Sequence, residues 1–430
     1  MKILIKNGRI INPADGMDKV SDMLVEDGIV KEISQNINTS ADKVIDANKM
    51  WVTPGFIDLH VHLREPGFEH KETISTGSRA AAAGGYTTVC CMPNTKPVTD
   101  SIEVVEYIRI EAEKNGVVNV LPIGAITKGQ EGNELADIEG MYKAGICAIS
   151  EDGKSVMNAQ LLKEAMIKAK ELNIPVLSHC EDKSLVKGGC MNEGAHCDSL
   201  GLKGISNDSE DVIVARDIVL AESTGAKLHL CHMSTKGSIE LLNEAKKRGV
   251  NVTGEITPHH FTLSDEAVDG KDTNTKMNPP LRSKDDVEAM RKALKDGIAD
   301  TISTDHAPHS AEEKAKDYQA APFGIVGSET SFALSNSVLV EEGYLTPSAL
   351  IEKMSYNPAK ILGIDKGDIS VGKIADITIT NPEKVFKIDK EKFYSKGKNT
   401  PFDGYEVKGS VEYTIVGGRI VFEKGKINDN

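Results

Sequence analysis

The chain has 430 residues, with 51 lysines and arginines against 65 aspartates and glutamates, and therefore a net charge of −14. This length suits one large domain with a smaller one. The negative charge argues against a surface for nucleic acid or acidic membranes, because both need clustered positive charge. The first residues lack the apolar core of a signal peptide, and no apolar run reaches the length of a membrane span. We therefore expect a cytoplasmic protein that binds neither nucleic acid nor a membrane.

Both ends of the chain contain short alternating segments separated by Asn-Gly, Asp-Gly or proline, a pattern typical of antiparallel strands. We expect residues 1–55 and 366–430 to join in one small β-sandwich domain beside a central domain, residues 56–365. The expected strands are Ile3–Lys6, Asp22–Glu26, Ile29–Ile33, Lys43–Asp46, Asp376–Thr380, Val411–Val416 and Arg419–Phe422.

In the central region, eight short apolar runs alternate with amphipathic stretches. The expected strands are Phe56–His62, Tyr86–Asn94, Asn119–Thr127, Ile146–Asp152, Pro175–Glu181, Lys227–Ser234, Asn251–His259 and Asp300–His306. The expected helices are Glu72–Ala83, Ser101–Lys114, Asp137–Ala144, Asn158–Leu172, Ser209–Thr224, Ser238–Lys247 and one that includes Arg291–Lys295. Continuously apolar strands favour a parallel sheet covered by helices, and eight of them can close into a (β/α)8 barrel of the TIM type. An open, doubly wound sheet is the alternative, and polar residues at the ends of several strands favour the barrel.

Candidate metal ligands lie at or just beyond the ends of five expected strands. They are His60, His62, Asp152, His179, His232 and Asp305. His60 and His62 point the same way, because side chains on a strand repeat with a period of two. Burying all six groups together without a cation would cost several kcal/mol for each unpaired group. The set suits zinc or a similar ion and is large enough for two ions, but one ion held by His60, His62, Asp305 and water also fits.

Arg64 follows His62 by two residues and therefore lies on the same face of the strand. Its planar guanidinium suits a substrate carboxylate. The sequence thus predicts metal-assisted attack on an anionic substrate.

The seven cysteines are an odd number, typical of buried, reduced thiols in a chain of this size. Cys190, His196 and Cys197 lie close in sequence, but their spacing fits no standard zinc pattern. We expect no metal there.

Over nearly its whole length, the chain resembles class I bacterial dihydroorotases of the amidohydrolase superfamily. The motifs that carry this resemblance are Asp58–Gly67, Met92–Asp100, Ser150–Gly153, Ser178–Glu181, His229–Ser234, Thr257–His260, Asn278–Arg282, Thr304–His309 and Phe323–Thr330. Many superfamily members share the His-x-His pair, whereas the combination of HLREPG, PNTKPVTD and TDHAPH is narrower.

The resemblance implies two zinc ions: His60, His62 and Asp305 hold the first, His179 and His232 hold the second, and Asp152 and a hydroxide bridge the pair. Asp152 stands where many relatives have a carbamylated lysine. Lys154 is nearby but lies past the end of the strand, and strand alternation points Glu151 away from Asp152.

The resemblance also implies a set of substrate contacts. Arg64, Asn94 and His309 would bind the carboxylate of dihydroorotate, and Asn278 with the backbone of Pro322, Phe323 and Gly324 would contact the edges of the ring. We expect His259, His260 and His306 to be structural or to support the ligands, and His70 and His196 to lie on the surface or in loops.

The implied reaction is the reversible cyclisation of N-carbamoyl-L-aspartate to L-dihydroorotate, a step of de novo pyrimidine synthesis. The zinc-bridging hydroxide would attack the amide carbon, and Asp305 would act both as a ligand and as the proton shuttle.

For Ser310–Gln319 we expect one of three structures: a solvated helix, a disordered loop or a lid over bound substrate. Two other functions remain open: an allantoinase or hydantoinase-type cyclic amidase, and a non-catalytic partner of aspartate transcarbamoylase. A homodimer and an association of the active enzyme with aspartate transcarbamoylase also follow from the resemblance.

Overall fold

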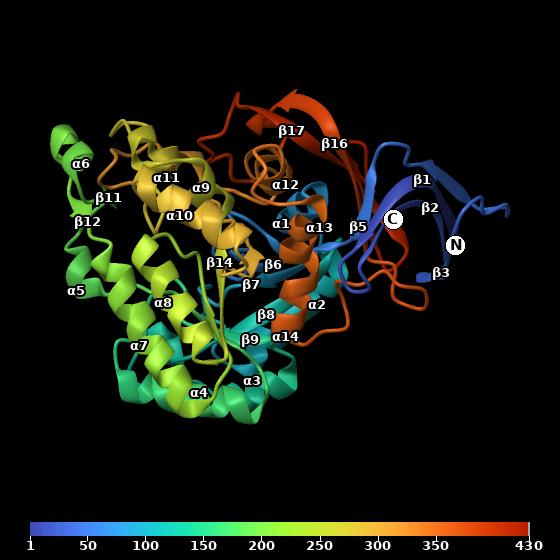
Figure 1. The fold of residues 1–430 in the computed structure, drawn as a ribbon. Helices are drawn as coiled ribbons and strands as arrows, with labels where there is room; N and C mark the ends of the chain where they lie inside the picture. Colours follow the sequence, from blue (N-terminus) through green and yellow to red (C-terminus); the bar gives the residue numbers. More distant parts are fainter. Residues whose placement is uncertain (429–430) are drawn as a thin grey trace.

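The computed structural model describes residues 1–428. Its central sheet has eight parallel strands in the order β15-β14-β13-β10-β9-β8-β7-β6 (Figure 1). The strands are β6 (Phe56–Val61), β7 (Tyr86–Cys91), β8 (Asn119–Ala125), β9 (Ala148–Ser150), β10 (Val176–Ser178), β13 (Leu228–Leu230), β14 (Val252–Ile256) and β15 (Thr301–Ile302). The edges meet where Val61 forms a parallel bridge with His306 and the His62 N–H donates to the His306 carbonyl at 2.8 Å. The predicted barrel is confirmed.

Helices surround this barrel, and the main ones follow the predicted positions. They are α1 (Ile74–Ala83), α2 (Ile102–Asn115), α3 (Ile138–Ala144), α4 (Ala159–Glu171), α7 (Asp208–Thr224), α8 (Lys236–Lys247) and α10 (Lys284–Lys295). The last helix begins well before Arg291, because the Ser283 hydroxyl caps it by accepting from the Asp286 N–H. Shorter helices are α5 (Lys183–Val186), α6 (Ala195–Leu200), α9 (Pro258–Thr262), α11 (Ala311–Lys314), α12 (Ser331–Ser335), α13 (Pro347–Ile351) and α14 (Asn357–Leu362). Strands β11 (Met191–Asn192) and β12 (Gly204–Ile205) pair outside the barrel.

Several barrel strands end earlier than the apolar runs predict. β13 ends at Leu230 and β15 at Ile302, before the polar residues that follow. His232 and Asp305 have φ angles of 33° and 47°, in the left-handed region that a strand ladder does not accommodate. The chain therefore leaves the sheet to aim these two side chains, and the strand assignment shortens accordingly.

The two chain ends form one sheet of nine strands, in the order β19-β18-β17-β16-β5-β1-β2-β3 with β4 paired to β1. The strands are β1 (Lys2–Asn12), β2 (Met17–Glu26), β3 (Ile29–Ser34), β4 (Lys43–Asp46), β5 (Trp51–Pro54), β16 (Ile377–Lys387), β17 (Glu406–Val416), β18 (Arg419–Glu423) and β19 (Lys426–Ile427). The first strand of the chain, β1, and the last, β19, lie in this sheet, to one side of the barrel (Figure 1). β5 joins the two ends by pairing antiparallel with β16.

The expectation that both ends build one β unit is confirmed, and its pairing is mixed rather than purely antiparallel. β1 pairs in parallel with both β4 and β5. Apolar side chains from both ends pack in one cluster, which includes Ile5, Ile10, Val52, Ile377 and Ile415. All seven cysteines are free thiols, as expected. Within residues 1–428, no helix is long and apolar enough to cross a membrane.

Candidate metal centre

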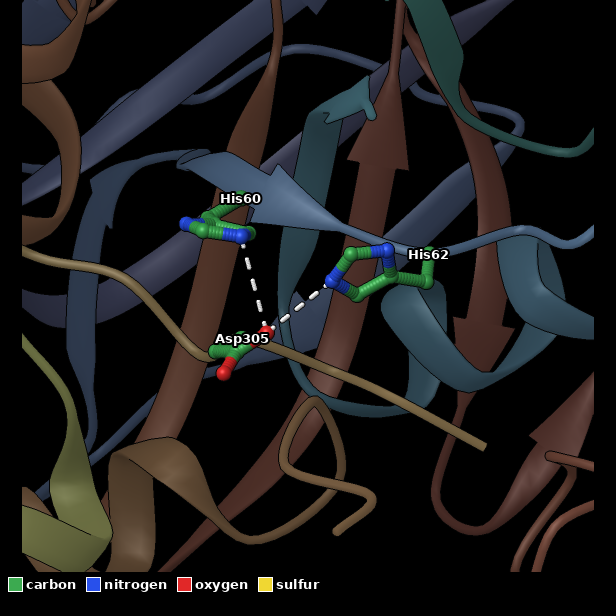
Figure 2. A group of neighbouring side chains, drawn as sticks. All are labelled: His60, His62 and Asp305. Carbon is green, nitrogen blue, oxygen red and sulfur yellow. Dashed lines mark hydrogen bonds and ion pairs between the residues drawn. The ribbon is translucent and has the colours of Figure 1, made fainter. Parts of the chain in front are cut away.

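Residues from the two closing strands of the barrel form the first half of the site. His60 lies on β6 and His62 just beyond its end, and both converge on Asp305, which follows β15 (Figure 2). The Asp305 Oδ1 atom lies 3.1 Å from Nε2 of His62 and 3.5 Å from Nε2 of His60. Closure of the barrel therefore brings Asp305 to two predicted ligands that lie more than 240 residues earlier in the sequence.

Asp152 joins this half to the second one. Its Oδ1 lies 3.2 Å from Nε2 of His60, 3.3 Å from Nδ1 of His179 and 3.7 Å from Nε2 of His232. The other oxygen, Oδ2, lies 3.4 Å from Nε2 of His62. All six predicted ligands thus form one cluster, with Asp152 at its centre, and none is more than 7% exposed.

The geometry of this cluster fits divalent cations. Tetrahedral zinc with ligand bonds of 2.0–2.1 Å has neighbouring donor atoms about 3.3 Å apart, and the spacings given above scatter around that value. Nε2 of His60 and Oδ1 of Asp152 are buried and have no hydrogen-bond partner within residues 1–428. Such atoms are costly without a cation that both can bind. The structure therefore supports a metal cofactor at this place.

Neighbouring polar groups set the orientation of the two β6 imidazoles. Nδ1 of His60 lies 2.8 Å from Oε1 of Glu255, and Nδ1 of His62 lies 2.9 Å from Oδ1 of Asn94. Both oxygens are acceptors, so each Nδ1 carries the proton and each Nε2 keeps its lone pair for a metal. Glu255 was missed by sequence reasoning, although a glutamate in the apolar run of β14 was a signal that a buried carboxylate has polar partners.

The charges of the site favour positively charged occupants. Burial lowers the pKa of His60, but the carboxylates of Asp152 and Asp305 outweigh it and raise that pKa well above its usual value. Burial likewise opposes ionisation of Asp305, whereas the imidazoles of His60 and His62 hold its pKa below the ordinary range. Protons and metal ions compete for the same nitrogen and oxygen atoms, so a field that attracts one also attracts the other.

Two of the predicted substrate contacts, Arg64 and His309, bond backbone carbonyls. Arg64 is half-buried and donates from Nε to the Pro308 carbonyl at 3.2 Å. Nε2 of His309 donates to the carbonyl of Phe323 at 2.7 Å. Burial, together with the positive charge of Arg64, lowers the pKa of His309 to about 2, so its imidazole is neutral. Gly324 packs against it, because a Cβ there would lie 3.1 Å from the His309 Nε2.

The two predicted asparagines have partners among the acidic and ligand residues. Besides its contact with His62, Asn94 donates from Nδ2 to Oδ2 of Asp152 at 3.5 Å. Asn278 donates from Nδ2 to Oε1 of Glu181 at 2.7 Å, and the other Glu181 oxygen lies 3.9 Å from Nε2 of His179. Asn94 therefore contacts two of the predicted ligands directly, and Asn278 reaches a third, His179, through Glu181.

The acidic end of β9 is arranged as strand alternation predicts. Glu151 turns away from Asp152 and accepts the backbone N–H groups of Ile126 and Thr127 at 3.1 and 3.0 Å. Lys154 donates to the carbonyl of Gln130 at 2.8 Å. Its Nζ is thus engaged outside the ligand cluster, which supports Asp152 as the group shared by both halves.

The remaining histidines divide into buried and peripheral ones. His259, His260 and His306 are buried. His306 accepts two backbone N–H groups through Nδ1, and its own carbonyl closes the barrel. His70 is exposed, and His196 bonds a loop carbonyl, as expected for peripheral residues.

Ser310–Gln319 is anchored to the neighbouring loop. Buried Lys314 donates to the carbonyls of Thr273, Lys276 and Pro322 at 2.9, 3.2 and 3.0 Å. The segment contains the short helix α11, and Lys314 fastens it beside the substrate-side residues. Most of its side chains are exposed, as on a solvated helix, and buried Lys314 and Tyr318 anchor it.

This chain is a (β/α)8 barrel whose strand ends carry four imidazoles and two carboxylates. That combination is typical of metal-dependent amide hydrolases of the amidohydrolase type. Residues 229–422 match the amidohydrolase family, and residues 49–238 match the dihydro-orotase-like family. The chain is 53% identical over 426 residues to a dihydroorotase of Caldanaerobacter subterraneus subsp. tengcongensis, covering 99% of this chain and 98% of that protein. A dihydroorotase of Geobacter metallireducens is 52% identical over 425 residues, covering 99% and 100%. The chain belongs to the dihydroorotase family.

Solved structures of related enzymes share the whole fold. The L-hydantoinase (dihydropyrimidinase) from Arthrobacter aurescens superimposes with a TM-score of 0.90 at 27% identity, covering 99% of this chain and 97% of that one. A D-hydantoinase from Thermus sp. gives a TM-score of 0.85 at 28% identity, covering 100% and 97%.

Proposed function

We propose that this protein is a dihydroorotase, which interconverts L-dihydroorotate and N-carbamoyl-L-aspartate by opening and closing a cyclic amide. One observation carries the proposal: all six metal ligands predicted from the dihydroorotase motifs converge in one buried cluster beside Arg64. The full-length identity to dihydroorotases supports the same reaction.

We assign two zinc ions to the cluster. His60, His62 and Asp305 would hold one, His179 and His232 the other, and Asp152 would be shared, since it contacts imidazoles of both halves. When bound, zinc lowers the pKa of water and polarises a carbonyl oxygen.

The protein's own groups would bind the substrate and move the proton. Arg64 would bind the carboxylate through its guanidinium, whose planar fork matches two carboxylate oxygens. His309 would hold the backbone at Phe323 beside the ring through its Nε2 contact. Asp305 would accept a proton at its carboxylate and return it to the departing ring nitrogen, and the same carboxylate would serve the reverse direction.

Hydrolysis of hydantoins is the second candidate, favoured by the close structural likeness to hydantoinases. The hydantoinases share the whole fold with this chain. Dihydroorotate has a larger ring than hydantoin and also carries a carboxylate, for which Arg64 offers a matching cation. Identity to dihydroorotases near 50% over the whole chain, against 27–28% to the hydantoinases, favours dihydroorotate.

Turnover of L-dihydroorotate, allantoin and hydantoin by one purified sample tests this proposal, together with its metal content. We expect turnover of dihydroorotate, lost on chelation and restored by zinc. Turnover of hydantoin or allantoin alone would overturn the substrate assignment. Bound zinc without any turnover would instead favour a non-catalytic partner of aspartate transcarbamoylase. Light scattering of the protein, alone and mixed with aspartate transcarbamoylase, tests the homodimer and the association that the family resemblance predicts.

A further inference from the structure

The seventh barrel strand, β14, contributes none of the six ligands, yet it carries the carboxylate of Glu255. This side chain is fully buried. Removing an ionised carboxylate from water costs several kcal/mol unless charged or hydrogen-bonding partners compensate. Burial of the Glu255 carboxylate therefore carries a desolvation cost that an apolar residue at the same position would not have.

Three groups around the ligand cluster engage Glu255. Oε1 lies 2.8 Å from Nδ1 of His60 and accepts the backbone N–H of His232 at 3.2 Å. Oε2 lies 3.1 Å from Nε2 of His229, whose Nδ1 contacts the Thr253 hydroxyl at 2.8 Å. Both carboxylate oxygens are thus occupied, and His229 is itself held in place.

Spacing alone would also allow Glu255 to form a separate cation site with Cys231 and His60. The contacts argue against that site. Nδ1 of His60 and Oε1 of Glu255 lie at hydrogen-bonding distance, and the other Glu255 oxygen already engages His229. Glu255 therefore acts on the ligands of the described metal centre rather than on an ion of its own.

We infer that Glu255 is a positioning residue that serves both halves of the metal centre at once. By accepting the proton of Nδ1, it fixes the tautomer of His60 and leaves the Nε2 lone pair facing Asp152 and Asp305. By accepting the backbone N–H of His232, it holds that residue at its left-handed φ of 33°. One carboxylate thus orients a ligand of each proposed ion, and the inference rests on the proposed two-ion centre.

Asn94 provides an internal comparison. It contacts Nδ1 of His62 with a neutral amide oxygen, where Glu255 contacts His60 with a charged one. His62 belongs to the first proposed ion alone. Loss of Glu255 should therefore weaken both ions, and loss of Asn94 should weaken chiefly the first, apart from its longer contact with Asp152.

Zinc affinity of Glu255→Gln, measured by competition with a chromogenic chelator, tests the inference without any enzyme assay. Partners of this kind typically change metal affinity by about 10–100-fold, and we expect both bound ions to weaken within that range. Asp376→Asn is the matched control, because Asp376 is also a buried carboxylate but bonds Lys366, Asn119 and the Gly417 N–H and none of the predicted ligands. It should bind zinc like the wild type. Zinc binding by Glu255→Gln at wild-type affinity, or an equal loss in Asp376→Asn, would overturn the inference.

Two further measurements separate positioning from stability. Without zinc, Glu255→Gln should unfold at about the wild-type temperature, and zinc should raise its midpoint less than it raises that of the wild type. Nitrogen NMR of histidine-labelled wild-type protein should show Nδ1 of His60 protonated, and a proton on Nε2 instead would refute the inference even if the variant does not fold. If the wild-type protein retained no divalent ion, the proposed metal centre itself would be refuted. That outcome is distinct from a failure of the Glu255 inference, which concerns how the ligands are positioned.

Discussion

Asp305→Asn isolates the role of the Asp305 carboxylate as a proton carrier. Asparagine keeps the shape of the side chain and an oxygen that can face Nε2 of His62, now at 3.1 Å, but it loses the charge and the basic oxygen. Proton transfer by a positioned group contributes about 10²–10⁴-fold to rate, which corresponds to about 2.7–5.4 kcal/mol of activation free energy. Substrate binding should change little. The negative charge of Asp305 attracts the Arg64 guanidinium and so competes with an anionic substrate. Removing that charge therefore does not weaken the attraction between Arg64 and the substrate.

The assay is steady-state hydrolysis of dihydroorotate by zinc-loaded protein whose metal content is measured in the same sample. We expect kcat to fall by the factor given above and KM to change by less than about threefold, the signature of a group that acts in the transition state. Loss of one charged ligand also lowers zinc affinity, so the comparison is made at saturating zinc. Equal losses in kcat and in substrate affinity, or a kcat near the wild-type value, would refute the shuttle role.

Three further predictions concern the metal and the buried acids. Chelation should abolish turnover and lower the unfolding midpoint in a scanning calorimeter, because each site saturated at 100 times its Kd contributes about 2.7 kcal/mol; an unchanged midpoint would argue against a metal in the folded protein. Lys154→Met should keep the wild-type zinc content and Asp152→Ala should lose at least one ion by elemental analysis, whereas loss of zinc in Lys154→Met would point to a modified lysine. Burial raises the pKa of Glu329 to about 8, so between about pH 4.3 and 8 the folded state binds more protons than the unfolded state and loses stability as pH rises. Glu329→Gln should therefore melt near the wild type at pH 5 and above it at pH 8.5, and a difference that shrinks with pH would contradict this.

The sequence contains enough information to predict the barrel and the six residues, proposed as metal ligands, that converge in one buried cluster. Eight apolar runs and their intervening amphipathic stretches are strong periodic signals, and the ligands follow the strand ends where such barrels place their sites. Strand lengths were less accurate. Residues such as His232 and Asp305 continue an apolar run in sequence, but their left-handed backbone takes them out of the sheet.

Long-range polar contacts were harder to predict. Glu255 lies 195 residues from His60, and no local pattern links the two. The role of Asn94 shows the same difficulty, because motif resemblance suggests contact with a substrate, whereas the folded chain also places Asn94 against His62. Periodicity identifies which face of an element is buried, but the pairing of buried polar groups depends on the closed barrel.

The fold does not decide the substrate, since the L-hydantoinase from Arthrobacter aurescens shares it with a TM-score of 0.90. The choice must therefore depend on groups that recognise what dihydroorotate has and a neutral ring lacks, namely its carboxylate. Arg64, which we propose for this role, has a left-handed φ of 63° and donates from Nε to the Pro308 carbonyl. A hydrogen bond to a charged group contributes about 1.5–3 kcal/mol, so Arg64→Met should lower kcat/KM for dihydroorotate by about 10–100-fold. Inhibition by dihydrouracil, the same ring without the carboxylate, should stay unchanged. If both ligands weaken equally, Arg64 supports the site as a whole and the choice of substrate resides elsewhere.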